Sequence, residues 1–182
     1  MSSPKRRSLK PLALALVFAF ANVALAVQTG QAVPVEFKLR TADGGEITSE
    51  MLRGDVVVLA FGASWLPLSR AQVEGVQKLA DQYSERNVRV YWVSTDSASP
   101  KSKNYATDGQ LRDFAKRQGL KVAILRDSEG SLVKALHIDQ LPSVVLLNRA
   151  GSVSGSPVGG LDPNGNLADQ LAPRLNKLLA EN

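Results

Sequence analysis

The sequence Phe61-Gly62-Ala63-Ser64-Trp65-Leu66-Pro67-Leu68-Ser69-Arg70 follows directly on the apolar run Val56 to Ala60. A continuous apolar run of this kind predicts a central strand that is covered on both faces. From Leu68 to Tyr83 the apolar residues recur at helical spacing, which predicts a helix. The quoted stretch is therefore expected to form a corner at which a buried strand gives way to a helix.

The rest of the chain alternates between predicted strands and helices and ends in a hairpin and a closing helix. The other strands are expected over Val35 to Leu39, Glu46 to Thr48, Val88 to Val93, Val122 to Leu125, Ser143 to Asn148 and Ser152 to Pro157. The other helical segments are expected over Ser49 to Leu52, Leu111 to Ala115, Leu132 to Leu136 and Leu167 to Leu178. Pro173 is expected to kink the last helix or to delay its start.

Two further motifs flank the first strand of that hairpin. Gln140-Leu141-Pro142-Ser143-Val144 leads into it, and Asn148-Arg149-Ala150-Gly151 forms the turn after it. Together with the frame Trp65-x-Pro67-x-x-Arg70, these motifs resemble the thioredoxin-like superfamily. The resemblance is greatest to the TlpA/ResA-type periplasmic redoxins, and it covers residues 35 to 182.

The resemblance implies an α/β, thioredoxin-like fold with a central mixed sheet flanked by helices. It also implies an N-terminal β extension and a helix-strand insertion between Gly109 and Leu125. Pro142 would be the family's cis-proline, on a loop opposite the corner that carries Trp65. Since only about 5–6% of X-Pro bonds in folded proteins are cis, a cis Leu141-Pro142 bond is a specific expectation.

The family's catalytic sulfurs are missing from this chain. In relatives the corner has the sequence Ala-Ser-Trp-Cys-Pro-Pro-Cys-Arg, whereas here Leu66 and Ser69 stand at the cysteine positions and the chain has no cysteine. Thiol-disulfide exchange needs one thiolate to attack and a second sulfur to resolve the mixed disulfide. The buried strand Val56 to Ala60 also lacks the acidic residue that the family often places near its buried cysteine. We therefore expect a redox-inactive protein without catalytic residues.

The peptide-binding surface of the family does not depend on sulfur. The cis-proline loop has backbone groups that can pair with an extended peptide, like an added strand. The resemblance therefore implies that an extended peptide or a partner protein binds at Trp65, Leu66, Pro67, Leu141, Pro142 and Ser143. For Trp65, covering the edge of the core is the alternative role. Ser69 is expected to be a helix N-cap or a first-turn residue.

Two other functions remain open from the sequence. One alternative is a redoxin-related subunit that acts in redox homeostasis through a partner's cysteines or cofactor, and the other is a purely structural subunit. No cofactor or metal of its own is expected, because His137 is the only histidine and has no cysteine to join it. A structural, hydrogen-bonded role is expected for His137.

The N-terminus has the pattern of a secretory signal peptide over residues 1–26. Four basic residues precede an apolar stretch from Pro11 to Leu25, and Ala24-Leu25-Ala26 offers a cleavage site. We expect a linker over 27–33, a thioredoxin-like domain over 34–182, periplasmic localisation and no stable membrane insertion after cleavage. The signal peptide holds four of the 22 basic residues and none of the 17 acidic residues, so the remainder has a net charge near +1. This charge gives no reason to expect a nucleic-acid partner.

Overall fold

The computed structural model describes residues 33–159 and 166–181. The expected signal peptide at 1–26 and nearly all of the expected linker at 27–33 lie outside these residues, so both remain predictions. Among the described residues, no helix is both long enough and apolar enough to span a membrane.

A mixed sheet forms the centre of the described chain. Its seven strands have the order β2-β1-β5-β4-β3-β6-β7. The three parallel strands are β3 (Val56–Gly62), β4 (Val88–Ser94) and β5 (Ile124–Arg126). The antiparallel strands are β1 (Lys38–Thr41), β2 (Glu46–Thr48), β6 (Ser143–Leu147) and β7 (Val158–Gly159). The α/β class, the N-terminal β extension (β1 and β2) and the mixed sheet are thereby confirmed.

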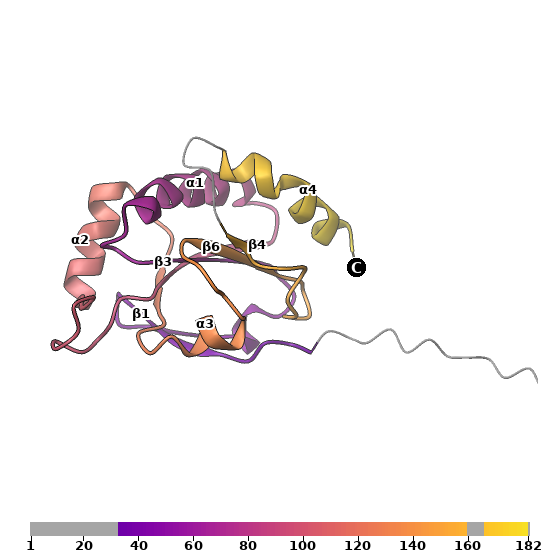
Figure 1. Cartoon of the computed structure of the whole chain (residues 1–182). Helices are drawn as coiled ribbons and strands as arrows, with labels where there is room; N and C mark the ends of the chain where they lie inside the picture. Colours follow the sequence, from indigo (N-terminus) through magenta and orange to yellow (C-terminus); the bar gives the residue numbers. More distant parts are fainter. Residues whose placement is uncertain (1–32, 160–165, 182) are drawn as a thin grey trace, which may run out of the picture. The chain divides into compact units, whose positions relative to one another are not determined.

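The helices lie on both faces of this sheet (Figure 1). One face carries α1 (Pro67–Tyr83), α2 (Asp108–Gln118) and α4 (Leu167–Ala180). The other face carries the short α3 (Ser131–Ala135), and a single 3-10 turn, η1 (Glu50–Leu52), follows β2. The expected insertion is present, since α2 and β5 stand between β4 and α3.

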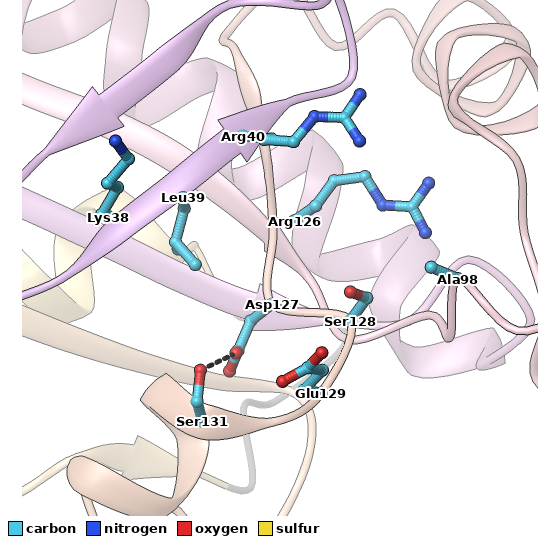
Figure 2. Close-up of a pocket in the computed structure, with 9 residues that line it drawn as sticks. All are labelled: Lys38, Leu39, Arg40, Ala98, Arg126, Asp127, Ser128, Glu129 and Ser131. Carbon is cyan, nitrogen blue, oxygen red and sulfur yellow. Dashed lines mark hydrogen bonds between the residues drawn. The ribbon is translucent and has the colours of Figure 1, made fainter.

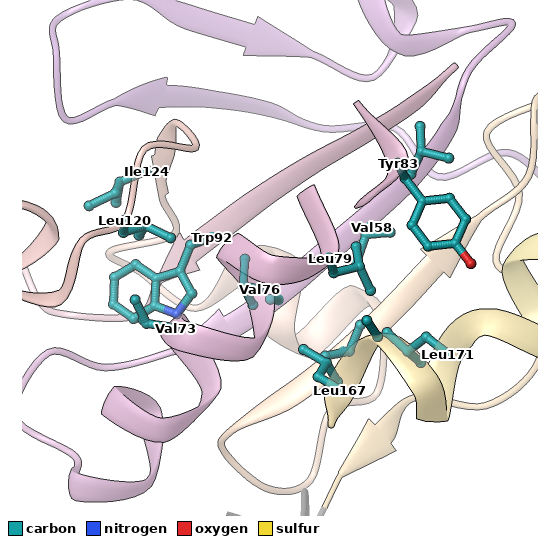
Figure 3. Close-up of a cluster of buried hydrophobic side chains, with 14 of the residues drawn as sticks. Val58, Val73, Val76, Leu79, Tyr83, Trp92, Leu120, Ile124, Leu167 and Leu171 are labelled. Carbon is teal, nitrogen blue, oxygen red and sulfur yellow. The ribbon is translucent and has the colours of Figure 1, made fainter. Parts of the chain in front are cut away.

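Strand β3 contributes side chains to both hydrophobic cores, because its side chains alternate between the two faces of the sheet. Val56, Val58 and Ala60 join one buried cluster with α1, α2 and α4 (Figure 3). Val57, Leu59 and Phe61 join the cluster on the α3 side. All seven residues of β3 are buried, as the continuous apolar run predicts.

The N-terminal strand begins later than expected. The prediction was Val35 to Leu39, but β1 spans Lys38–Thr41. The residues before it bond elsewhere: the Val35 amide donates to the Gly151 carbonyl at 2.9 Å, and the Phe37 amide donates to Ser49 Oγ at 3.2 Å. Strand β5 is shifted in the same direction, from the predicted Val122 to Leu125 to the observed Ile124–Arg126.

The second arm of the C-terminal hairpin was predicted wrongly. The return strand was expected over Ser152 to Pro157, but β7 is Val158–Gly159, and Val153 forms only an isolated bridge to Leu147. Between the Leu147–Val153 bridge and the Val144–Val158 pair, β6 advances three residues and the returning arm five. Gly155, at φ 70°, lies in these extra residues, which interrupt the ladder as a bulge does.

Pro173 does not delay the last helix. Helix α4 begins at Leu167, where the Asn166 side chain accepts a hydrogen bond from the Ala168 amide at 3.0 Å, and Pro173 lies inside the helix. Of the two effects expected of Pro173, a kink or a delayed start, the delayed start does not occur. An N-cap of this type stabilises the first turn by satisfying an amide that has no helical acceptor.

Helices α1 and α4 pack closely against each other at Gly75. A Cβ added there would lie 2.8 Å from the Cβ of Leu167, which cannot move without the helix. We expect Gly75→Ala to lower the free energy of unfolding by roughly 1–2 kcal/mol, since overpacking outweighs the gain in helix propensity. Gly109→Ala in α2 is the matched control, because its Cβ would meet only contacts of 3.7 Å or more. Urea denaturation of both variants measures the difference, and an equal effect would contradict the close packing.

Candidate functional site

The corner between β3 and α1 is held by the backbone. The Leu66 amide donates to the Ala63 carbonyl at 3.1 Å, and the Ser69 amide donates to the Leu66 carbonyl at 3.0 Å. Leu66 is extended (φ −81°, ψ 121°) and precedes the helix, while Pro67 occupies its first turn. Proline is well suited there, because a first-turn amide has no helical acceptor to lose.

The two residues at the cysteine positions lie in different environments. Ser69 is fully buried in the first turn of α1, and its Oγ accepts a hydrogen bond from the Ala63 amide at 3.1 Å. The first-turn prediction is thereby confirmed, and the N-cap is Leu66 instead. Leu66 itself is half-buried. Neither side chain can form a thiolate.

Apolar side chains are exposed at this corner. Trp65 is 52% exposed and Leu68 is 47% exposed, and Trp65 belongs to neither buried cluster. Pro67 between them is exposed as well. This exposure speaks against the alternative in which Trp65 covers the edge of the core.

The Leu141-Pro142 bond is cis, as expected from the resemblance. Ser143 pairs with Phe61 in the β3–β6 ladder, so this proline lies at the end of the sheet where β3 enters the corner. Pro142 and Ser143 are buried and Leu141 is half-buried. The structure therefore brings together the two segments that the sequence analysis assigned to one groove.

In the cis-proline loop, the backbone of Leu141 is available for hydrogen bonding. Its amide and carbonyl make no hydrogen bond with any residue that the structure describes. The Ser143 carbonyl, by contrast, accepts a bond from Gln72 Nε2 at 3.1 Å, and Ser143 pairs with neighbours on both sides. Of the three loop residues expected to bind, Leu141 is the one whose amide and carbonyl both lack a partner among the described residues.

Gln72 connects three elements beneath the corner, although the sequence patterns did not single it out. Its side chain is buried in α1, donates to the Ser143 carbonyl of β6 and accepts from Trp92 Nε1 of β4 at 3.2 Å. A polar residue among the apolar positions of a helix was the available signal. Buried amides of this kind are retained only when their partners are in place.

Asp96 is a second buried residue of the site that the sequence patterns did not single out, and it places an acid near the corner although the strand Val56 to Ala60 has none. It is buried just after β4, and its carboxylate accepts from the Ser64 amide at 2.9 Å and from Ser64 Oγ at 2.8 Å. Ser94 Oγ donates to the same carboxylate at 2.8 Å. This acid follows β4 in the chain, so the sequence of Val56 to Ala60 gives no sign of it. Its role here is to hold Ser64, the residue before Trp65.

Arg126 supports the loop that carries Asp96. Its buried guanidinium forms an ion pair with Asp108 at 2.6 Å and donates to the carbonyls of Ala106 at 2.9 Å and Asp96 at 3.3 Å. Figure 2 shows Arg126 beside Arg40 in a hollow of about 240 Å³, with Asp127 accepting a hydrogen bond from Ser131. The arginine thus links the insertion to the candidate site.

The role expected for His137 was wrong. His137 is exposed at φ 51°, and its ring makes no hydrogen bond with any described residue. It lines a hollow of about 450 Å³ together with Ser143 and Gly159. No group of three or more histidine, cysteine, aspartate or glutamate residues suited to a metal occurs in the part of the chain that the structure describes.

Comparison with known proteins agrees with this geometry. Residues 29–156 match the AhpC/TSA family, which is most of the chain. The chain belongs to the AhpC/TSA family. The matched residues contain the cis-proline loop and the strand-to-helix corner, but they contain no cysteine.

Two curated relatives are thiol-disulfide oxidoreductases. The sporulation thiol-disulfide oxidoreductase A of Bacillus subtilis is 27% identical over 146 residues, which cover 80% of this chain and 84% of that protein. The thiol-disulfide oxidoreductase ResA of Halalkalibacterium halodurans is 27% identical over 142 residues, covering 78% and 74%. The solved structure of StoA from Bacillus subtilis superposes with a TM-score of 0.60 at 26% identity, covering 79% of this chain and 98% of that one. The chain is thus a ResA/StoA-like member of the thioredoxin-like fold.

We expect Asp96→Asn to destabilise the corner. Asparagine offers one acceptor oxygen where the carboxylate offers two, so at least one of the three donors faces an amide NH₂ group instead of an acceptor, at a cost of roughly 1–3 kcal/mol. Asp113→Asn on the exposed face of α2 is the control and should change stability by less than about 0.5 kcal/mol. Urea denaturation measures both, and equal effects would refute the anchoring role of Asp96.

Proposed function

We propose that this protein is a redox-inactive, exported thioredoxin-like protein that binds an extended segment of a partner protein. The groove consists of Trp65, Leu66 and Pro67 on the corner and Leu141, Pro142 and Ser143 on the cis-proline loop. The observation that carries the proposal is the exposed Trp65 at the same end of the sheet as Leu141, whose backbone has no hydrogen-bond partner among the described residues.

The two segments supply complementary kinds of contact. The amide and carbonyl of Leu141, which bond to none of the described residues, are suited to pairing with an extended backbone, and such pairing gives affinity without regard to sequence. Trp65 and Leu68 supply apolar area for the side chains of the same segment. Aromatic residues in such positions carry a large share of the binding energy in protein interfaces. The groove thus favours an extended segment with apolar side chains.

Binding in this groove needs no thiol. The corner is fixed by Ser69, Gln72 and Asp96, which are all buried and hydrogen-bonded. A relative with cysteines would release its client by resolving the mixed disulfide, whereas this chain can hold a client only through non-covalent contacts.

Export is proposed from the N-terminal sequence. Lys5, Arg6, Arg7 and Lys10 precede the apolar stretch that ends at Ala24-Leu25-Ala26. This pattern supports delivery to the periplasm, where unfolded or partly folded clients would be available to the groove.

A binding measurement tests the groove. We expect Trp65→Ala to weaken binding of carboxymethylated α-lactalbumin, an unfolded protein with blocked thiols, at least about tenfold, since the substitution removes the largest apolar contact. Met51→Ala is the matched control because Met51 is also exposed (63%) but lies in η1. Fluorescence anisotropy of the labelled client measures both affinities. Equal binding by the Trp65→Ala variant and the unchanged protein would refute the groove.

Restoring the sulfurs tests whether the corner is intact. We expect the double variant Leu66→Cys with Ser69→Cys to catalyse the reduction of insulin disulfides by dithiothreitol, measured as turbidity. The two new thiols would pass two electrons and two protons to the insulin disulfide and become joined to each other, and dithiothreitol would reduce them again. Each single variant is the control and should be much slower, since Leu66→Cys lacks the resolving thiol and Ser69→Cys lacks the attacking thiol. A folded but inactive double variant would contradict an intact corner.

A further inference from the structure

A pocket of about 350 Å³ lies between α2, the turn after β1 and the segment that leads into β5. It shares no lining residue with the candidate groove. Its inner wall is apolar: Ala42, Leu120 and Ile124 are buried, while Ala115 and Val122 are half-buried. This pocket therefore combines apolar surface with partial access to solvent.

The C-terminal end of α2 forms one side of the pocket. Gly119 has φ 69°, and the Leu120 amide donates to the Ala115 carbonyl at 2.9 Å while the Gly119 amide donates to the Lys116 carbonyl at 3.3 Å. These two bonds form a Schellman motif, which turns the residue after the glycine back onto the last helical turn. Leu120 and Ala115 consequently face the same space.

Hydrogen bonds also fix the other sides. Arg112 donates to the Ala42 carbonyl, and the Ala42 amide donates to the Ile124 carbonyl at 2.9 Å. The Lys121 amide donates to Gln77 Oε1 on α1 at 2.7 Å. Because backbone groups on each side are held in this way, the pocket exists before any ligand arrives.

The rim of the pocket is positively charged. Arg112, Lys116 and Lys121 line it, against the single carboxylate of Asp43. Neither Lys116 nor Lys121 forms an ion pair with a residue in the described part of the chain. Two ammonium groups next to an apolar wall favour a ligand that carries a negative charge on an apolar body.

We propose that this pocket binds a small amphipathic carboxylate, with its apolar chain against Ala115, Leu120 and Val122. Its carboxylate would pair with Lys116 and Lys121. The volume lies near the lower end of the range for small-molecule sites, about 300–1,000 Å³. A stable protein interface buries about 800 Å² of surface on each partner. The walls of this pocket expose far less surface than that. A small molecule therefore fits better than a protein segment.

A titration followed by ¹H–¹⁵N NMR tests the proposal on the purified protein. Octanoate should shift the amide signals of Ala115, Leu120 and Val122 saturably. Acetate lacks the apolar chain and 1-octanol lacks the charge, so both should bind more weakly at the same residues. The double variant Lys116→Gln with Lys121→Gln should weaken octanoate binding roughly three- to tenfold.

The matched control is Lys101→Gln with Lys103→Gln, because both lysines are exposed and lie outside the pocket. This control should bind octanoate as the unchanged protein does. Equal affinity for 1-octanol, or unchanged binding by the Lys116→Gln/Lys121→Gln variant, would refute recognition of the carboxylate. Saturable shifts that appear only around Trp65, or no saturable shifts at all, would refute the pocket.

Discussion

The pairing of β3 with β6 is the constraint on which the candidate site depends. Phe61 lies opposite Ser143, so the residues that follow β3 and the residues that precede β6 emerge at the same end of the sheet. Gln72 strengthens this arrangement, since it joins α1 to the Ser143 carbonyl. A shift of this ladder by one residue would turn every side chain of β6 to the opposite face and would also move the cis-proline loop relative to the corner.

A polar network stabilises the corner where relatives have a disulfide couple. Asp96 holds Ser64, and Arg126 holds the loop of Asp96 through two carbonyls. Arg126 belongs to β5, in the helix-strand insertion, so the insertion supports the site although it adds no residue to the groove. Removing one member leaves buried donors or acceptors without partners, which costs more than the bond itself contributes.

The sequence was most informative where a single segment determines its own structure. The buried run of β3, the helical spacing of α1 and the cis-proline motif were all predicted correctly, with boundaries shifted by a residue or two. The misses were non-local. Asp96 meets Ser64 across 32 positions and Gln72 meets Ser143 across 71, so no local pattern could pair them. The bulge around Gly155 was missed because periodicity does not show where a returning arm leaves its ladder.

The two replacements at the cysteine positions differ because their surroundings differ. Position 69 is fully buried and faces the Ala63 amide, so an apolar residue there would leave a buried donor without an acceptor. Serine supplies the oxygen that this amide needs and is close in size to cysteine. Position 66 is half-buried and has no such donor to satisfy, so leucine can stand there and add apolar surface beside Trp65. The buried position thus kept a polar atom, whereas the outer position became suited to contact with an apolar chain.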